Sequence, residues 1–225
     1  NPADVHKHAI LAWMLDRLTE KPKPLSYVET HAGRALYDLS AAEALKTGEA
    51  AAGVARMLTR FAPDHPYRRA VEAARATSGA HAYPGSPWIA AHLLRGEDRL
   101  HLAELHPQEH EALRAAMRGK AKVHRADGYE LALSLCPPEP RRGMLLIDPS
   151  YELRGDYAAM PRLLADLHRK WNVGVLALWY PVLEGPEASH RAMTAALLAA
   201  GYPKLLHSEV RFAPARPGHR MVGSG

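Results

Sequence analysis

Four consecutive apolar residues that lead into a short polar motif constrain this chain more than any other feature. The run Met144–Ile147 has the pattern of a strand buried on both faces, as in the middle of a parallel sheet. It ends at Asp148–Pro149–Ser150–Tyr151. Ligands bind at the carboxyl ends of strands in open α/β sheets. A planar amino group could be held there by the Asp148 carboxylate, the rigidly placed Pro149 carbonyl and the Tyr151 ring. An ordinary Asp-Pro turn would have the same sequence.

Helical and strand-like segments alternate along the chain, which predicts an α/β fold with a doubly wound, mostly parallel sheet. Asp4 and Ser86 are the expected caps of two helices, and no strand is expected between 41 and 79. Between the strand expected to end near Asp127 and the apolar run at 144–147, a loop with Pro137, Pro138 and Pro140 is expected. The other expected strands are 25–33, 99–105, 121–126, 173–181 and about 205–212, and the expected helices are 4–18, 67–76, 87–94, 107–118, 157–170 and 189–200.

Acidic residues recur at or near the ends of successive predicted strands. Glu104, Asp127 and Asp148 are separated by 23 and 21 residues, which is about the length of one βα unit. We therefore expect the three carboxylates to share one rim of the sheet, where they would suit the hydroxyl and amino groups of a nucleoside cofactor. Each of them alone could equally be a helix cap or a turn residue.

A helical insertion is predicted between the first two strands. Glu104 follows the glycine turn at Gly33 by 71 residues, whereas about 20 is usual in a dinucleotide-binding unit. Residues 41–80 are therefore predicted to form a small helical subdomain, inserted into a Rossmann-like domain made of residues 1–40 and 81–225. The subdomain could help to hold a large substrate or could serve packing alone.

Composition limits the class of protein further. A chain of 225 residues that is 47% apolar can bury a sizeable core. We expect a cytoplasmic protein, because no apolar run is long enough to span a membrane, no signal peptide is evident and Cys136 is the single cysteine. We also expect a monomer. The scattered histidines have no metal-ligand spacing, so no metal is expected.

The charge balance is basic, with a net charge of +5 and a pI near 9.4. Such an excess suits a polyanionic partner such as nucleic acid, because Lys and Arg release phosphate counterions. A merely basic solvated surface is the alternative. The basic residues gather at Arg114, Arg118, Lys120, Lys122, His124, Arg125, Arg141, Arg142, His168, Arg169, Lys170, Arg211, Arg216, His219 and Arg220.

Several short motifs, taken in their order and spacing, resemble the class I S-adenosylmethionine-dependent methyltransferases. Within them the chain is similar to the RlmJ family, which methylates adenine N6 in 23S ribosomal RNA. The resemblance runs from Asn1 to Gly225. The motifs that carry it are Ala3–His8, Glu29–Gly33, Tyr83–Pro87, Glu104–Pro107, Ala126–Gly128, Asp148–Tyr151 and Ala177–Pro181.

The resemblance implies a role for each matching position. Asp148, Pro149 and Tyr151 would hold the flipped target adenine, and Lys7 would lie near the substrate face. The expected contacts of S-adenosylmethionine are His8, His31, Ser86, Glu104, Asp127, Gly128 and Asp148. The chain departs from the family at Ser150, where the family has a second proline, and it lacks the family's first few residues and a further strand after Gly225.

Three other functions are compatible with parts of this pattern. A nicotinamide-dependent oxidoreductase would share the fold, but it predicts further glycines after Gly33, where Arg34 and Ala35 stand. A non-catalytic RNA-binding protein would retain the basic surface without needing Asp148. A DNA adenine-N6 methyltransferase would use the same chemistry as the RNA enzyme.

Overall fold

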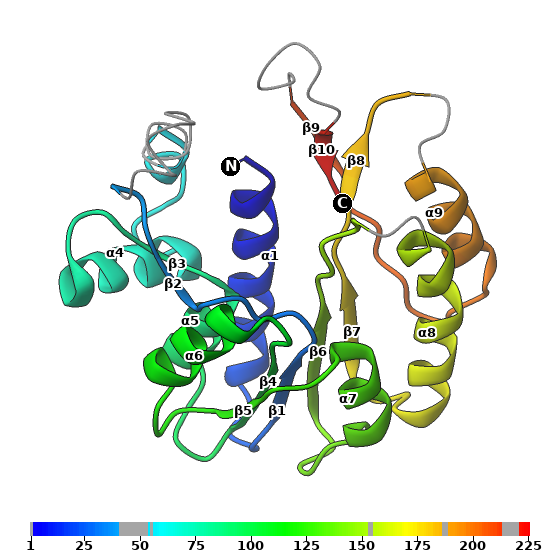
Figure 1. Cartoon of the computed structure of the whole chain (residues 1–225), viewed down its shortest axis with the longest axis horizontal. Helices are drawn as coiled ribbons and strands as arrows, with labels where there is room; N and C mark the ends of the chain where they lie inside the picture. Colours follow the sequence, from blue (N-terminus) through cyan, green and yellow to red (C-terminus); the bar gives the residue numbers. More distant parts are fainter. Residues whose placement is uncertain (1, 41–53, 55, 153–154, 186–188, 213–220) are drawn as a thin grey trace.

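A five-stranded parallel sheet forms the centre of the molecule (Figure 1). The computed structural model describes residues 2–40, 54, 56–152, 155–185, 189–212 and 221–225. The strand order is β5-β4-β1-β6-β7, so the chain moves outward from β1 and then returns to place β6 on its other side. The strands are β1 (Ser26–Glu29), β4 (Arg99–Ala103), β5 (Lys122–His124), β6 (Gly143–Ile147) and β7 (Val175–Leu178). This arrangement confirms the predicted doubly wound sheet.

Helices cover both faces of the sheet, because side chains of a central strand alternate between them. Met144 and Leu146 of β6 pack with one set of helices, whereas Leu145 and Ile147 pack with the other. The first face is covered by α1 (Pro2–Thr19), α5 (Ser86–Leu93) and α6 (Pro107–Ala116). The second is covered by α7 (Gly128–Leu135) and α8 (Asp156–Lys170), with α9 (Ser189–Ala199) packed against α8.

A third apolar cluster joins the helical region after β1 to the main body. The helix α4 (Pro66–Ser78) packs against α1 and α5, and Val54 and Leu58 are buried in the same cluster. A short antiparallel pair, β2 (Leu36–Asp38) and β3 (Ala82–Pro84), links this region to the sheet. Residues 41–53 and 55 of the predicted insertion lie outside the described residues, and the division into two domains stays a prediction.

The end of the chain departs from the predicted pattern. The fifth strand is shorter than expected and lies at the sheet edge, with Val175 38% exposed, so it is not a fully buried strand. The expected parallel strand near 205–212 is wrong. Only β9 (Val210–Arg211) forms there, and it belongs to a separate antiparallel sheet with β8 (Pro181–Leu183) and β10 (Met221–Ser224). Leu206 is 88% exposed, so this apolar stretch is not buried as a sheet strand.

Local boundaries also differ from the sequence expectations. The helix α7 occupies residues that were expected to form a loop, and Asp127 is its N-cap. The first helix begins at Pro2, so Asp4 lies in its first turn. Ser86 is the first residue of α5, whose N-cap is Gly85. Among the residues described, no helix is long and apolar enough to cross a membrane.

Gly143 provides a test of the close pairing between β1 and β6. A Cβ at this position would lie 1.9 Å from the carbonyl oxygen of Ser26, whereas a Cβ at Gly96 would meet nothing within 4 Å. Gly143→Ala should therefore lower the free energy of unfolding by about 2–3 kcal/mol. Gly96→Ala should change it by less than about 0.5 kcal/mol. Urea denaturation measures both, and equal effects would contradict the pairing.

Candidate functional site

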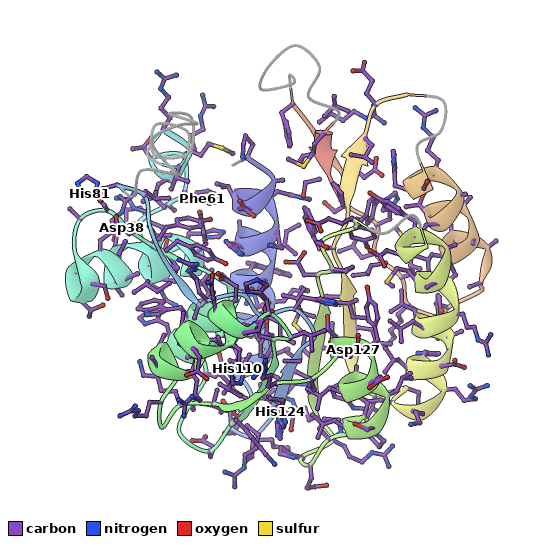
Figure 2. All side chains as sticks on the ribbon, in the orientation of Figure 1. Asp38, Phe61, His81, His110, His124 and Asp127 are labelled. Atoms are coloured by element: carbon purple, nitrogen blue, oxygen red, sulfur yellow. The ribbon has the colours of Figure 1, made fainter. Side chains whose placement is uncertain are left out.

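The carboxyl ends of the parallel strands bring the predicted acidic residues to one edge of the sheet. Glu104 follows β4, Asp127 follows β5 and Asp148 follows β6; Figure 2 labels Asp127, where β5 leads into α7. His31, just after β1, lies within electrostatic range of all three carboxylates; burial lowers its pKa, and these negative charges oppose the shift. The topological switch between β1 and β6 lies at this edge, which is where an open α/β sheet binds ligands.

Glu104 closes the turn that follows β1. Its two carboxylate oxygens accept hydrogen bonds from the backbone N–H of Gly33 at 2.8 Å and of His106 at 2.7 Å. Gly33 has a φ of +62°, in the left-handed region, and a Cβ there would lie 2.6 Å from the hydroxyl of Tyr37. The turn therefore needs glycine, and Glu104 holds it beside the end of β4.

Asp127 combines a structural contact with a free acceptor. Its Oδ1 accepts from the N–H groups of Tyr129 at 2.9 Å and Glu130 at 3.0 Å, which caps α7. No described residue hydrogen-bonds to Oδ2. The following Gly128 allows α7 to approach β1 closely, because a Cβ there would lie 2.0 Å from the carbonyl oxygen of Thr30. The cap therefore fixes the position of a carboxylate oxygen that remains available to a ligand.

Asp148 is held by Lys7 of α1. The ammonium donates to Oδ2 of Asp148 at 2.5 Å and lies 3.7 Å from Oδ1 of Asp4. The side chains of Lys7 and Asp148 are each 11% exposed. Burial alone would lower the pKa of Lys7, but Asp148 and Asp4 together raise it above its ordinary value, so Lys7 is a cation. No described residue hydrogen-bonds to Oδ1 of Asp148.

The rest of the Asp148–Tyr151 motif is held in an unusual backbone conformation. Tyr151 has a φ of +55°, which is uncommon for a residue with a side chain. Its hydroxyl donates to the carbonyl of Trp179 at 2.8 Å, and its ring centroid lies 4.3 Å from that of Tyr157. These two contacts hold the strained residue in place. Pro149 is buried and Ser150 is exposed.

The two predicted histidines have different surroundings. His31 is partly buried, with Nδ1 2.7 Å from the hydroxyl of Thr30 and its ring edge-on to Tyr129. His8 is buried on α1, with Nδ1 2.9 Å from the hydroxyl of Tyr83. Burial, together with the charge of Lys7, lowers the pKa of His8 to about 3, so it is neutral near pH 7. His31 therefore lies with the strand-end carboxylates, whereas His8 contacts a β3 residue.

Glu29 is a buried carboxyl group that the predicted site did not include. It ends β1 and accepts hydrogen bonds from the hydroxyls of Ser86 and, at 2.9 Å, Tyr27. Burial raises its pKa to about 8, although both hydroxyls oppose the shift. The predicted cofactor residue Ser86 is thus tied to the end of β1. The sequence signal that could have placed Glu29 in the site was a charged residue at the end of a predicted strand.

Trp179 and Ser224 are also absent from the predicted site. The Lys7 ammonium lies 4.9 Å from the centroid of the Trp179 ring. The indole N–H of Trp179 donates to the hydroxyl of Ser224 at 2.7 Å. Trp179 follows β7 of the central sheet. An aromatic residue directly after a predicted strand was a sequence signal that could have placed it in the site. Ser224 gave no such signal, because only the folded chain brings β10 beside this edge.

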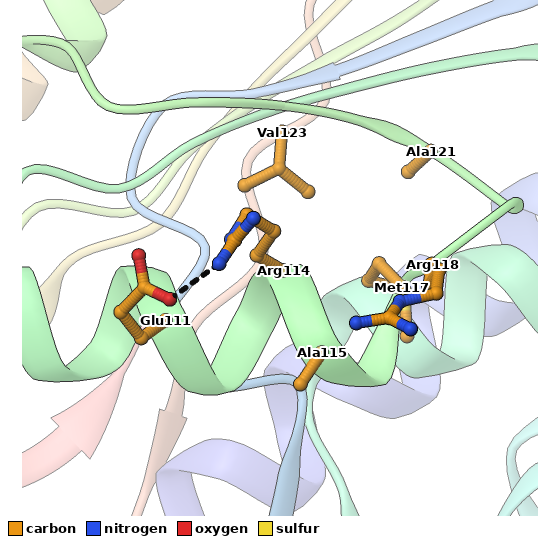
Figure 3. Close-up of a pocket in the computed structure, with 7 residues that line it drawn as sticks. All are labelled: Glu111, Arg114, Ala115, Met117, Arg118, Ala121 and Val123. Carbon is orange, nitrogen blue, oxygen red and sulfur yellow. Dashed lines mark hydrogen bonds and ion pairs between the residues drawn. The ribbon is translucent and has the colours of Figure 1, made fainter.

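The described residues also form a hollow that is lined by none of these groups. It measures about 250 Å³ and lies between α6 and β5 (Figure 3). Arg114 and Arg118 line it together with the apolar side chains of Met117 and Val123. Arg114 is bonded to Glu111 at 2.8 Å. None of the predicted site residues lines this hollow. Among the described residues, no group of three or more His, Cys, Asp or Glu is arranged to hold a metal ion.

The strand order and the carboxylates beside the β1–β6 switch define a Rossmann-like class I methyltransferase fold. The structure is similar to that of a crystallised Legionella pneumophila protein, with a TM-score of 0.82 and 33% sequence identity, over 100% of this chain and 83% of that one. That protein is LPL1258. Sequence comparison identifies the family more closely.

Residues 22–225 match the family model described as ribosomal RNA large subunit methyltransferase D, RlmJ. Two relatives are both named ribosomal RNA large subunit methyltransferase J. The Escherichia coli K12 protein is 37% identical over 100% of this chain and 81% of its own length. The Haemophilus influenzae protein is 34% identical over 100% of this chain and 82% of its own length. The chain belongs to the RlmJ family, as the sequence motifs predicted.

Glu29 makes the stability of the fold depend on pH in a predictable direction. Its pKa is about 8 in the folded chain, against an ordinary value of 4.5. Its contribution to stability is therefore full below pH 4.5 and is lost as the pH rises to about 8. Relative to wild type, Glu29→Gln should gain about 1 kcal/mol of unfolding free energy per pH unit across this window.

Urea denaturation from pH 4 to 9 measures this difference. The exposed Glu139→Gln provides a matched control, for which the difference from wild type should stay constant with pH. A constant difference for Glu29→Gln as well would show that the folded chain does not raise the pKa of Glu29.

Proposed function

We propose that this protein transfers a methyl group from S-adenosylmethionine to the exocyclic N6 of an adenine in 23S ribosomal RNA. Membership of the RlmJ family supports the class of reaction and the RNA substrate. The observation that carries the choice of amino group is Asp148. Its Oδ2 is held by Lys7, and no described residue bonds to its Oδ1. A fixed carboxylate with one open oxygen is suited to accept a hydrogen from an amine.

The residues at the strand ends fit S-adenosylmethionine by their chemistry. The free Oδ2 of Asp127 can accept from the adenine amino group, and each Glu104 oxygen has a second lone pair for a ribose hydroxyl. The close approach at Gly128 holds the start of α7 against the backbone of Thr30, which follows β1. We assign His8, His31 and Ser86 to the surroundings of this cofactor. When bound, the cofactor supplies a methyl group activated by a sulfonium.

Asp148 and Pro149 would prepare the target amine. The lone pair of an exocyclic adenine nitrogen is delocalised into the ring, so the amine is a poor nucleophile. Oδ1 of Asp148 and the carbonyl of Pro149 can accept its two hydrogens, which favours a tetrahedral nitrogen with its lone pair directed at the methyl group. The rate then depends on positioning and on electrostatic stabilisation of the charge that develops on the nitrogen.

Tyr151 would hold the base in this orientation. An enzyme that acts on a base must first remove it from its stack, and a fixed aromatic ring offers a new stacking surface. The hydrogen bond to Trp179 and the contact with Tyr157 fix the Tyr151 ring before a base arrives. Asp148 is also placed to accept the proton that the amine releases after transfer.

The decisive experiment uses labelled S-adenosylmethionine with bare 23S ribosomal RNA or duplex DNA. Label should appear on the RNA, and nuclease digestion followed by mass spectrometry should identify N6-methyladenosine. Label on DNA alone would favour the DNA adenine enzyme. RNA binding without label on either substrate would favour the non-catalytic alternative.

Asp148 provides the mutational test. Asp148→Ala should abolish transfer, and Asp148→Asn, which nearly preserves the shape, should lower kcat by about 10³-fold or more. RNA affinity should change less than about threefold, because the phosphate backbone dominates it. The exposed Asp64→Asn is the control and should retain wild-type activity. Substantial transfer by Asp148→Ala would refute the assigned role.

We propose that the basic edge around the α6–β5 hollow contacts RNA phosphates. Arg118, Lys120, Lys122 and Arg125 are all exposed and have no ion pair within the described part of the chain. They lie within eight residues that contain no acidic side chain. Unpaired cations along one edge suit a phosphate backbone, whereas paired surface charges are largely neutralised.

Salt dependence measures this contact. The double variant Arg118→Gln, Lys122→Gln should weaken RNA binding and reduce the slope of log Kd against log salt by about 1–2. The control, Lys21→Gln with Lys23→Gln, removes the same charge from exposed residues after α1 and should leave the slope unchanged. The same slope in both double variants would place the RNA elsewhere.

A further inference from the structure

The Lys7 ammonium is surrounded by two carboxylates and one aromatic ring. Asp148 accepts its hydrogen bond at 2.5 Å, Asp4 lies at 3.7 Å, and the Trp179 ring centroid lies at 4.9 Å. A cation within about 6 Å of an indole face is attracted by the ring, and more strongly when water is excluded. Lys7 is 11% exposed, so the Trp179 ring acts on a largely desolvated cation.

The Trp179 ring is itself held in a defined orientation. Its N–H donates to the hydroxyl of Ser224, which is fully buried on β10. The same hydroxyl lies 2.9 Å from Nδ1 of His6 and 3.5 Å from the carbonyl of Ala3, both in the first turns of α1. Ser224 therefore connects the Trp179 ring to the helix that carries Lys7, and the ring cannot turn without breaking this connection.

Trp179 and Lys7 also meet the motif from two sides. The carbonyl of Trp179 accepts the hydroxyl of Tyr151, while Lys7 binds Asp148. The two ends of the motif are thus attached to Trp179 and to the cation above its ring. A displacement of the Trp179 side chain would remove one of the three groups around the Lys7 ammonium, so that Lys7 and the Asp148 oxygen bound to it could shift.

We propose that Trp179 is a positioning residue for methyl transfer: its ring, oriented by Ser224, holds the Lys7 ammonium so that Lys7 aims the Asp148 carboxylate at the target amine. This inference rests on the proposed function. Trp179 acts through Lys7 and Asp148, so its loss should lower kcat with little effect on the affinity for either substrate. A role in binding the base directly would instead raise the KM for RNA.

Kinetics in two backgrounds test this assignment. Trp179→Leu should lower the single-turnover rate at saturating substrates by about tenfold to thirtyfold, with both KM values within about twofold of wild type. Trp179→Phe keeps a ring face and should recover part of the rate. In a Lys7→Met background, which removes the cation but keeps a side chain of similar length, Trp179→Leu should cost less than about threefold, because the contact between the two residues is already lost. An equal cost in both backgrounds would overturn the proposal.

Nuclear magnetic resonance gives a readout that needs no activity. With lysine labelled at ¹³Cε, the Hε signals of Lys7 should be shifted upfield by the Trp179 ring current and should be assigned by their loss in Lys7→Arg. Trp179→Leu should abolish this shift, Trp179→Phe should reduce it, and Ser224→Ala should broaden or partly reduce it. A Lys7 signal that is unchanged in Trp179→Leu would also overturn the proposal.

Trp13 offers a matched control on the same helix. It is 50% exposed, and its ring carries the Arg17 guanidinium at 5.6 Å. Trp13→Leu should leave both the rate and the Lys7 signals unchanged. If wild type methylates no RNA, the proposed function fails and the positioning role fails with it. If wild type methylates RNA but the two-background comparison is additive, the positioning role alone fails.

Discussion

The ion pair between Lys7 and Asp148 connects the beginning of the chain to the end of its central strand. Two side chains that are each 11% exposed meet at 2.5 Å, and removal of either would leave a largely buried charge without its partner. The pair therefore requires α1 to lie over the carboxyl edge of the sheet. It also orders the carboxylate on which the proposed chemistry depends, since the remaining oxygen of Asp148 takes its direction from the one that Lys7 holds.

Several elements around this ion pair contribute hydrogen bonds that fix its surroundings. The small antiparallel sheet contributes Ser224, whose hydroxyl meets both Trp179 and the first turns of α1. The hydroxyls of Ser86 and Tyr27 donate to the two oxygens of Glu29, so this second buried carboxyl group needs no hydrogen bond from Lys7. The cofactor side and the substrate side of the proposed site thus have separate hydrogen-bonding partners.

Much of the sheet could be predicted because its signals are local. The apolar run at 144–147 is fully buried, and the spacing of Glu104, Asp127 and Asp148 matches their positions after three parallel strands. The helix α7 was missed because eight residues between a glycine and a proline-rich stretch give little periodicity. The apolar residues near 205 gave a wrong prediction of a buried strand. A run of apolar residues does not show whether they are buried, and Leu206 is exposed to solvent. The roles assigned to the site residues and the division at 41–80 remain predictions.

The sequence by itself determined the α/β class, the family and the polar motif that ends β6, because each depends on residue type and spacing along the chain. The tertiary structure decided which groups meet at that motif. Lys7 and Asp148 are separated by 141 residues, and Trp179 and Ser224 by 45. Such contacts depend on how helices and strands pack, since a side chain's partner is set by distance in space. Only the folded chain therefore brings one ammonium, one indole and one serine hydroxyl together beside a single carboxylate.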